Sequence, residues 1–265
     1  MVWTNRWLTG IFLLALCFLG QAAAEEKLSV PVLVYHRFGL TVADSMTVTT
    51  RVFAAQLQWL KDHHYTVIPL RTLVEYLRGQ GPPPPPQSVV ITADDGHKTV
   101  YTEMLPIVRQ YGIPVTLFIY PSAISNASYA MTWQQLQDLK QTGLFDIQSH
   151  TFWHPNFKQE KRKLSPDAYQ KLVETQLQKS KAILEKRLGG KVDLLAWPFG
   201  IYDDWLEKEA EKAGYVAAFS IDRRLAGPEE AVMALPRYLM VNGDDIKGFE
   251  AIVTGRAVEK RPPPH

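Results

Sequence analysis

Residues 88–96 read Ser-Val-Val-Ile-Thr-Ala-Asp-Asp-Gly, a β-branched apolar run that ends in two carboxylates and a glycine. A run of this length and composition predicts a buried strand. Gly96 permits a sharp turn directly after the strand. The stretch therefore predicts a buried strand with Asp94 and Asp95 at its carboxyl end, and similar strands recur on both sides of it.

Strands and helices are predicted to alternate along the whole chain. Buried strands are expected at residues 30–36, 67–68, 114–119, 145–150, 194–197 and 216–219. Helices are expected at about residues 50–64, 70–77, 100–111, 132–143, 165–190 and 203–213. Thr50 is the expected N-cap of the first helix, and residues 132–135 are expected to form a capping box at the start of the fourth. Repeated units of this size indicate an α/β protein with a parallel sheet covered by helices. About seven units in one domain favour a closed or nearly closed barrel. The proline run at 82–86 is expected to be a stiff surface connector, because the alternation resumes beyond it. The charged run at 158–163 is expected to be a surface loop.

The composition excludes several classes of protein. Of 265 residues, 46% are hydrophobic and 21% are charged, as in ordinary folded proteins. The 29 Lys and Arg against 27 Asp and Glu give a net charge of +2, so no basic surface indicates nucleic-acid binding. The single cysteine, Cys17, allows neither a disulfide framework nor a Cys-rich zinc site. A bound metal would therefore need histidine and carboxylate ligands.

The first 24 residues are typical of a secretory signal rather than of the fold. Arg6 precedes an apolar run at residues 11–19, which is followed by alanines at 22–24. The apolar run is shorter than the roughly 20 residues that a spanning helix needs. We expect cleavage after Ala24, with an uncleaved anchor as the alternative. The mature chain, 25–265, is then one exported domain without a spanning helix, located in the periplasm or outside the cell.

Four strand ends carry residues that could perform chemistry, and in parallel α/β proteins the active site lies at this edge. These ends carry His36, the pair Asp94 and Asp95, the pair His150 and His154, and residues 198–200. Successive strand residues point to opposite faces, so the two aspartates share a site only if the strand ends between them. His150 and His154 are four residues apart, a spacing that suits two imidazoles on one metal ion.

Three segments resemble the motifs of one known family. Residues 91–96 resemble the Thr-Phe-Asp-Asp-Gly motif of polysaccharide deacetylases, the NodB-homology or carbohydrate esterase family 4 domain. Residues 149–155 resemble the family's His-Ser/Thr-x-x-His metal motif, and residues 196–200 resemble its Arg-x-Pro-x-Gly motif. The resemblance extends over residues 30–241 and implies a single-domain distorted (β/α)7 barrel. This agrees with the strand and helix count.

The resemblance also implies a role for each motif residue. Asp95, His150 and His154 correspond to the ligands of a divalent metal, zinc first, with cobalt or nickel as alternatives. Asp94 corresponds to the general base. A divalent ion polarises an acetamide carbonyl and lowers the pKa of bound water, and a nearby carboxylate can take that water's proton.

Further residues are expected at the substrate. Trp153 and Trp197 flank the motifs and could stack on sugar rings, although burial is the alternative for each. By the resemblance, the motif residues Pro198, Phe199 and Gly200 also belong to the substrate-binding side. Arg237, from the segment Leu-Pro-Arg at 235–237, is placed there as well.

Two departures from the family pattern point to a subgroup. The arginine of the third motif is Ala196 here, and the family's late Leu-x-His motif, which supplies the general acid, has no counterpart. The family members that act on exported poly-N-acetylglucosamine resemble this sequence better and tend to lack the same features. His36, at the end of the first strand, is then the candidate general acid, because the ordinary histidine pKa of about 6.5 suits proton donation. Protonated Asp94 is the competing donor.

The sequence therefore predicts an exported, metal-dependent de-N-acetylase of an N-acetylglucosamine polymer, with exopolysaccharide export machinery as an expected partner. A peptidoglycan or chitin deacetylase is the nearest alternative. A non-catalytic carbohydrate-binding or export-scaffold protein is another, because the two motif residues are missing. A glycoside hydrolase that uses Asp94 and Asp95, with carboxyls roughly 5–10 Å apart, would leave His150 and His154 without a role.

Overall fold

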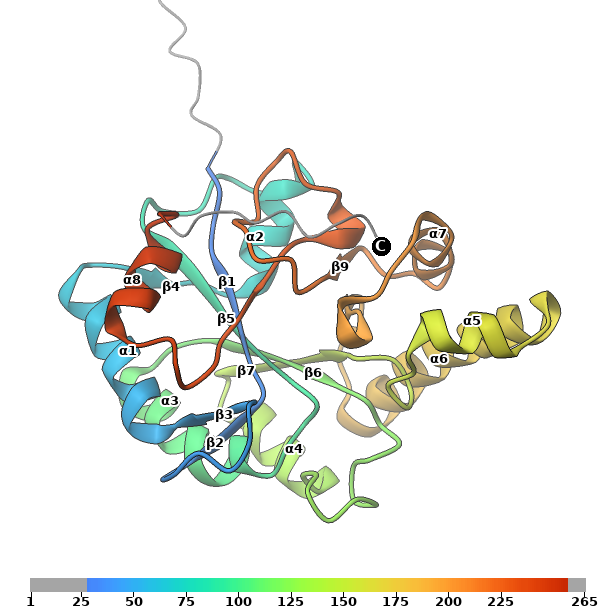
Figure 1. Ribbon diagram of the computed structural model, residues 1–265, viewed down its shortest axis with the longest axis horizontal. Helices are drawn as coiled ribbons and strands as arrows, with labels where there is room; N and C mark the ends of the chain where they lie inside the picture. The colour runs from blue at the N-terminus through green and yellow to red at the C-terminus, as the bar shows by residue number, and fades with distance from the viewer. Residues whose placement is uncertain (1–27, 257–265) are drawn as a thin grey trace, which may run out of the picture.

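The computed structural model describes residues 28–256, so the expected signal at residues 1–24 lies outside the described part. Parallel strands form the main sheet in the order β10-β1-β5-β6-β7-β8-β9, with β4 paired to β5 (Figure 1). The bounds are β1 Val32–Tyr35, β4 Thr66–Val67, β5 Ser88–Asp94, β6 Val115–Ile119, β7 Phe145–Ser149, β8 Leu194–Ala196, β9 Ala217–Phe219 and β10 Tyr238–Leu239. A separate pair of short strands, β2 Arg37–Gly39 and β3 Thr47–Thr49, follows β1.

The sheet curls so far that its two outer strands approach each other. Leu235 forms a bridge to Phe219 of β9, and a few residues later Tyr238 and Leu239 pair with β1. The N–H of Leu235 donates to the carbonyl of Ala218 at 2.8 Å. The segment 235–239 therefore connects the β9 side of the sheet to the β1 side. The predicted distorted (β/α)7 barrel is confirmed.

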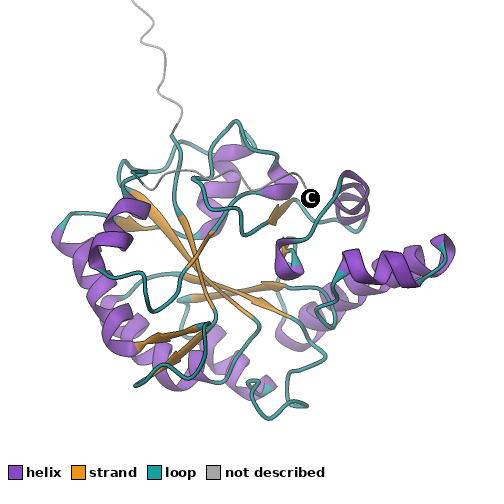
Figure 2. Ribbon diagram, in the orientation of Figure 1, coloured by secondary structure: helices purple, strands orange, loops and turns teal. Residues whose placement is uncertain are grey.

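Helices surround the crossed strands (Figure 2). Their bounds are α1 Thr50–Asp62, α2 Leu70–Leu77, α3 Leu105–Tyr111, α4 Trp133–Gln141, α5 Phe157–Lys163, α6 Pro166–Leu188, α7 Asp204–Lys212 and α8 Ile246–Val253. The predicted capping box of α4 is present, because Thr132 and Gln135 each bind the other's backbone. None of the helices between residues 28 and 256 is long and apolar enough to cross a membrane.

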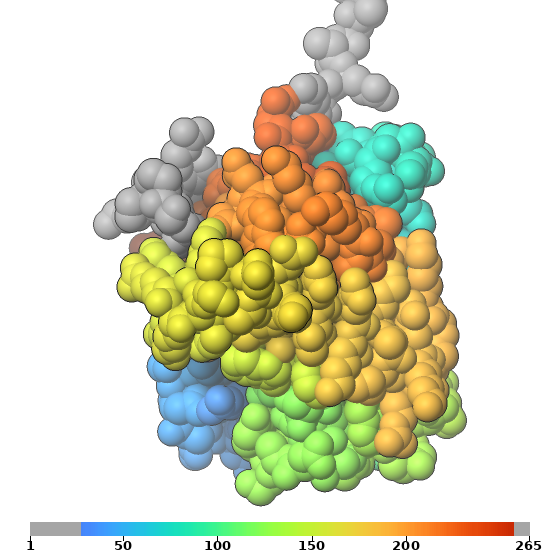
Figure 3. All heavy atoms as spheres, turned by 90° about the vertical axis from the view of Figure 1, so that its right-hand side faces the viewer, coloured from blue at the N-terminus to red at the C-terminus, as the bar shows by residue number. Residues whose placement is uncertain are grey.

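Two local expectations were wrong. The charged stretch at residues 158–163 was expected to be a surface loop, but it forms most of α5. The side chain of Asn156 accepts from the backbone N–H of Gln159 and so starts the helix. Helix α1 likewise has Thr49 rather than Thr50 as its N-cap. In Figure 3, α5 and the start of α6 (yellow) project toward the viewer beside the orange segment that contains α7.

The alternation of side chains along β5 positions the site. Val89, Ile91 and Ala93 pack into the layer between sheet and helices, whereas Val90 belongs to a second buried cluster inside the barrel. That inner cluster includes Phe118 of β6 and residues of α2, which closes the end of the barrel where the strands begin. Asp94 lies on the same face of β5 as Val90, because side chains repeat every two residues. Its carboxylate is therefore directed into the barrel, at the opposite end from α2.

Candidate active site

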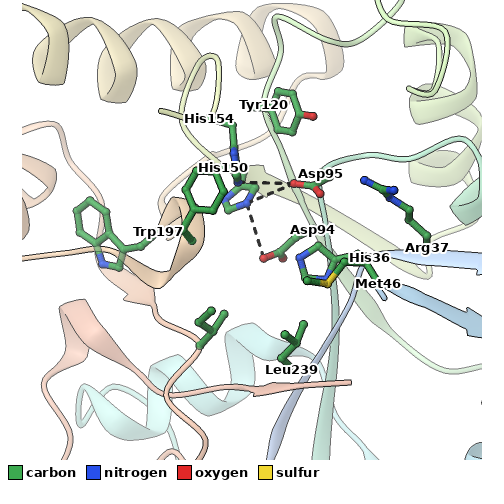
Figure 4. A pocket seen from close by; sticks show the side chains of 12 residues that line it. His36, Arg37, Met46, Asp94, Asp95, Tyr120, His150, His154, Trp197 and Leu239 are labelled. Atoms are coloured by element: carbon green, nitrogen blue, oxygen red, sulfur yellow. Dashed lines mark ion pairs between the residues drawn. The ribbon is translucent and has the colours of Figure 1, made fainter. Parts of the chain in front are cut away.

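A pocket of about 370 Å³ opens at the carboxyl ends of the strands (Figure 4). Its walls come from residues that are far apart in sequence. They are His36, Arg37, Met46, Asp94, Asp95, Tyr120, His150, His154, Trp197, Phe199, Ile221 and Leu239. Every acidic and histidine residue expected at the site from the sequence thus lines one cavity.

Asp95, His150 and His154 form the one cluster of possible metal ligands found among the described residues. One ligand atom from each lies within 4.8 Å of the others. The Nε2 atoms of His150 and His154 lie 3.6 and 3.8 Å from Oδ1 of Asp95. Dashed lines in Figure 4 mark these two contacts. All three side chains therefore converge on one point.

The hydrogen bonds of this cluster fit a bound cation. The Nδ1 atom of His150 lies 2.8 Å from the carbonyl oxygen of Ala196, so Nδ1 carries the ring proton and Nε2 presents a lone pair. Oδ1 of Asp95 is buried and has no hydrogen-bond partner among residues 28–256. Burial lowers the pKa of His154 to about 4, so this imidazole is neutral at pH 7. Two imidazoles and a carboxylate form the donor set of many catalytic zinc sites.

Unusual backbone conformations direct these side chains into the pocket. Strand β5 ends at Asp94, and Asp95 has φ of 72°. This turn brings both carboxylates to one pocket, as expected from the Asp-Asp-Gly sequence. His154 and Phe199 also have positive φ, 63° and 57°. Such conformations cost about 1–3 kcal/mol each and tend to occur at functional sites.

Asp94 lies beneath the cluster of possible metal ligands and is bound by Arg237. Two guanidinium nitrogens donate to its carboxylate oxygens at 2.8 and 2.7 Å. Nε of Arg237 donates to the carbonyl of Ser220, and the guanidinium packs 5.2 Å from the ring centre of Phe118. Burial alone would raise the pKa of Asp94, but the charge of Arg237 lowers it to about 2. Asp94 is therefore held ionised in a fixed orientation.

The structure corrects the expected role of Arg237. This residue was placed at the substrate, but it has 0% exposure and does not line the pocket. Ala196, which occupies the position of the motif arginine, is also buried. The guanidinium that the third motif lacks is thus supplied by the segment between β9 and β10.

His36 lines the pocket next to Asp94. Its Nδ1 atom is buried without a hydrogen-bond partner among the described residues. Burial lowers the pKa of His36, while the charges of Asp94 and Asp95 act in the opposite direction. The sequence argument used the ordinary pKa of histidine, so it overestimated the protonated fraction of this ring at pH 7.

The expected substrate residues divide into exposed and buried ones. Trp153 is 41% exposed and Phe199 is 55% exposed, and the Phe199 ring lies 4.5 Å from that of His154. Trp197 has 0% exposure and donates its indole N–H to the carbonyl of Met233, so it supports the wall from within. Pro198 and Gly200 are likewise buried. Stacking on a sugar is therefore open to Trp153 and Phe199, whereas for Trp197 the alternative of burial is the one observed.

Sequence reasoning missed five lining residues, which are Arg37, Met46, Tyr120, Ile221 and Leu239. Tyr120 had a usable signal, because it directly follows a buried strand at the edge where active sites form. Arg37 follows His36 and pairs with Asp44, a contact within the β2–β3 region that the sequence did not predict.

Comparisons with known sequences agree with this site. The family model "Polysaccharide deacetylase" matches residues 81–218. A poly-beta-1,6-N-acetyl-D-glucosamine N-deacetylase of Staphylococcus epidermidis is 28% identical over 212 residues, which cover 78% of this chain and 71% of that protein. The putative polysaccharide deacetylase YxkH of Bacillus subtilis is 26% identical, with 86% of this chain and 77% of that protein covered.

Solved structures share the fold. The Streptococcus pyogenes deacetylase PplD, in complex with acetate, superposes with a TM-score of 0.75 at 23% identity, covering 86% of this chain and 99% of that one. IcaB from Ammonifex degensii gives a TM-score of 0.74 at 21% identity, covering 87% of this chain and 97% of that one. With the family match over residues 81–218, these findings show that the chain belongs to the polysaccharide deacetylase family and is a hydrolase of non-peptide C–N bonds.

Proposed function

We propose that this enzyme is an exported, metal-dependent de-N-acetylase that hydrolyses the acetamide groups of poly-β-1,6-N-acetylglucosamine. The observation that carries the proposal is the convergence of Asp95, His150 and His154 beside the ionised Asp94. Relatives with 28% and 26% identity are named for this polymer, which supports the substrate. The expected signal at residues 1–24 supports export, where the polymer and its export machinery would be met.

Asp95, His150 and His154 would hold the metal, with zinc as the first candidate and cobalt or nickel as alternatives. When bound, a divalent ion polarises the acetamide carbonyl and lowers the pKa of a water molecule. The protein contributes the orientation of the ligands. The carbonyl of Ala196 fixes the His150 tautomer, and the turn after β5 directs Asp95 toward both rings.

Asp94 is proposed as the general base. Its Oδ2 atom lies 3.8 Å from Nε2 of His150, so the carboxylate borders the metal cluster without belonging to it. Arg237 keeps Asp94 ionised and prevents its rotation through two hydrogen bonds. The carboxylate is therefore ready to accept a proton from the attacking water.

His36 is proposed to protonate the departing amine. The ring lines the same pocket as Asp94, and its Nδ1 has no protein partner in the described residues. Because its pKa is lowered, His36 would be mostly neutral at pH 7 and would give up a proton readily once charged. Asp94, after accepting a proton, is the alternative donor.

The non-catalytic alternative loses much of its motivation in this structure. It rested on the missing motif arginine and the missing late histidine. Arg237 makes a contact to Asp94 that stabilises its ionised form, and His36 lines the same pocket as Asp94. A purely carbohydrate-binding protein would need neither a buried bidentate ion pair nor a converging set of ligands.

The test is acetate release by the purified protein with zinc, cobalt or nickel. Substrates are β-1,6-linked N-acetylglucosamine oligomers, with β-1,4-linked oligomers and peptidoglycan as comparisons, and a chelated sample is the control. We expect acetate from the β-1,6-linked oligomers and none after chelation. Acetate release only from the β-1,4-linked oligomers or peptidoglycan would show that the proposed polymer is not the substrate. Shortened oligomers with intact acetyl groups would indicate a glycoside hydrolase. No acetate from any substrate would contradict the proposal.

A further inference from the structure

Beside the cluster of Asp95, His150 and His154, the side chains of Tyr120, Tyr129 and His97 form one continuous surface. We call this surface the Tyr120–Tyr129 wall. Tyr120 follows β6 and lines the pocket, where Figure 4 shows it next to His154 and Asp95. Its hydroxyl oxygen lies 2.7 Å from that of Tyr129. The ring of Tyr129 in turn lies parallel to that of His97, with centres 6.1 Å apart and an interplanar angle of 11°.

The wall extends from the reaction centre to solvent. The Tyr120 ring centre is 5.3 Å from that of the ligand His154. Tyr129, at the other end, is 38% exposed. A polymer that places one acetamide beside His154 must continue out of the pocket. Because the Tyr120–Tyr129 wall begins at His154 and ends in solvent, it lies beside the next sugar residues of that polymer.

Backbone hydrogen bonds hold the two loops of the wall together. Lys98 N–H donates to the carbonyl of Tyr129 at 2.8 Å, and Met131 N–H donates to that of Gly96 at 2.9 Å. His97 and Ala130 form an antiparallel bridge between these two bonds. The loops after β5 and β6 thus form one unit, and the wall is arranged before any ligand binds, which favours affinity.

The wall has hydrogen-bonding capacity that the protein does not use. Tyr120 and Tyr129 carry two hydroxyl hydrogens, and their mutual bond uses one of them. Nδ1 of His97 lies 2.8 Å from the hydroxyl oxygen of Thr99, whereas Nε2 makes no hydrogen bond within the described residues. Donors and acceptors beside aromatic faces suit a ring that carries hydroxyl and acetamide groups.

We propose that Tyr120, Tyr129 and His97 form a binding subsite for the sugar residue next to the one that is deacetylated. This inference rests on the proposed function, because it assumes that the pocket takes a sugar polymer. The subsite makes the enzyme favour oligomers over a single sugar, since only an oligomer reaches both the metal cluster and Tyr129.

The first test compares kcat/KM for an N-acetylglucosamine tetramer with that for the monosaccharide, using the metal-loaded full-length enzyme. Tyr129→Phe and Tyr120→Phe each remove a hydroxyl, and one hydrogen bond corresponds to about a 3–10-fold change. We expect the tetramer's advantage to shrink by that factor, through KM rather than kcat. Tyr111→Phe is the matched control, because this hydroxyl binds Gln58 on α1, away from the pocket, and the advantage should not change.

The second test separates this inference from the proposed function. Tetramer binding to the full chain is measured by calorimetry in the presence of a chelator, so that no turnover occurs, and thermal unfolding confirms that each variant is folded. Weaker binding by Tyr129→Phe and Tyr129→Ala supports the subsite even if wild type releases no acetate, in which case the proposed function alone fails. Equal tetramer affinity in wild type and both variants overturns the subsite, whatever the turnover.

Discussion

The buried ion pair between Asp94 and Arg237 makes a quantitative prediction. Asp94 is 2% exposed and Arg237 is 0% exposed, and two hydrogen bonds of 2.8 and 2.7 Å join them. Arg237→Met keeps much of the apolar volume but leaves a buried carboxylate without its counter-charge. Breaking one side of such a pair costs about 3–5 kcal/mol. This is a large fraction of the roughly 5–15 kcal/mol by which typical domains are stable.

The assay is urea unfolding at pH 7 of wild type, Arg237→Met, Asp94→Asn and the double variant. We expect the double variant to be more stable than the sum of the single losses predicts, because it contains no unpaired buried charge. Arg256→Met is the control at a surface pair. Arg256 pairs with Glu250 where the side chains are 66% and 39% exposed, so its loss should cost about 1 kcal/mol or less. Additive losses, or a loss at Arg237 no larger than that at Arg256, would refute the reasoning.

Three further predictions concern the site and the barrel. His36→Ala should lower kcat by about 10²–10⁴-fold with metal content unchanged, and an unchanged kcat would assign the acid role elsewhere. Burial raises the pKa of Asp193, but its hydrogen bonds to Arg71 and Lys191 lower it overall. The ionised Asp193 therefore stabilises the fold above its unfolded-state pKa of about 4. This stabilisation is lost as the pH falls through the pKa of the folded state, which is lower. Asp193→Asn should therefore be less stable than wild type at pH 7 and closer to it at pH 3 by urea unfolding; a constant difference contradicts this. Gly200→Ala places a Cβ 2.5 Å from Ile221 Cγ1 at φ +66°, whereas Gly143→Ala, at φ +73°, meets nothing within 4 Å. The first substitution should lower the thermal unfolding midpoint more than the second, and equal shifts would show that Ile221 moves aside.

Local sequence patterns were sufficient to predict much of the fold and the cluster of possible metal ligands. Buried runs such as residues 88–94 are strands because their side chains are β-branched and apolar. Parallel strands bring their carboxyl ends to one edge, so Asp95, His150 and His154 could be placed together without knowing any distance. The glycine at 96 indicated the turn that lets both aspartates face the pocket.

Other features depend on contacts that no local pattern contains. Arg237 is 143 residues from Asp94, and only the closure of the barrel brings the two together. Trp197 stands inside a motif, but its burial is decided by Phe157 and Met233 from other elements. The charged run at 158–163 contains no apolar stripe, so its helix was not predicted. Asn156, a typical N-cap residue, was the available signal for this helix.

The central claim is that Asp95, His150 and His154 hold the metal while Asp94 moves the proton. It is tested most directly by measuring bound metal and acetate release in the same preparations of wild type, His150→Ala and Asp94→Asn, each checked for folding. The account predicts that wild type has both, that His150→Ala loses both, and that Asp94→Asn keeps the metal but releases no acetate. Acetate release by Asp94→Asn at the wild-type rate, or by His150→Ala without bound metal, would contradict it.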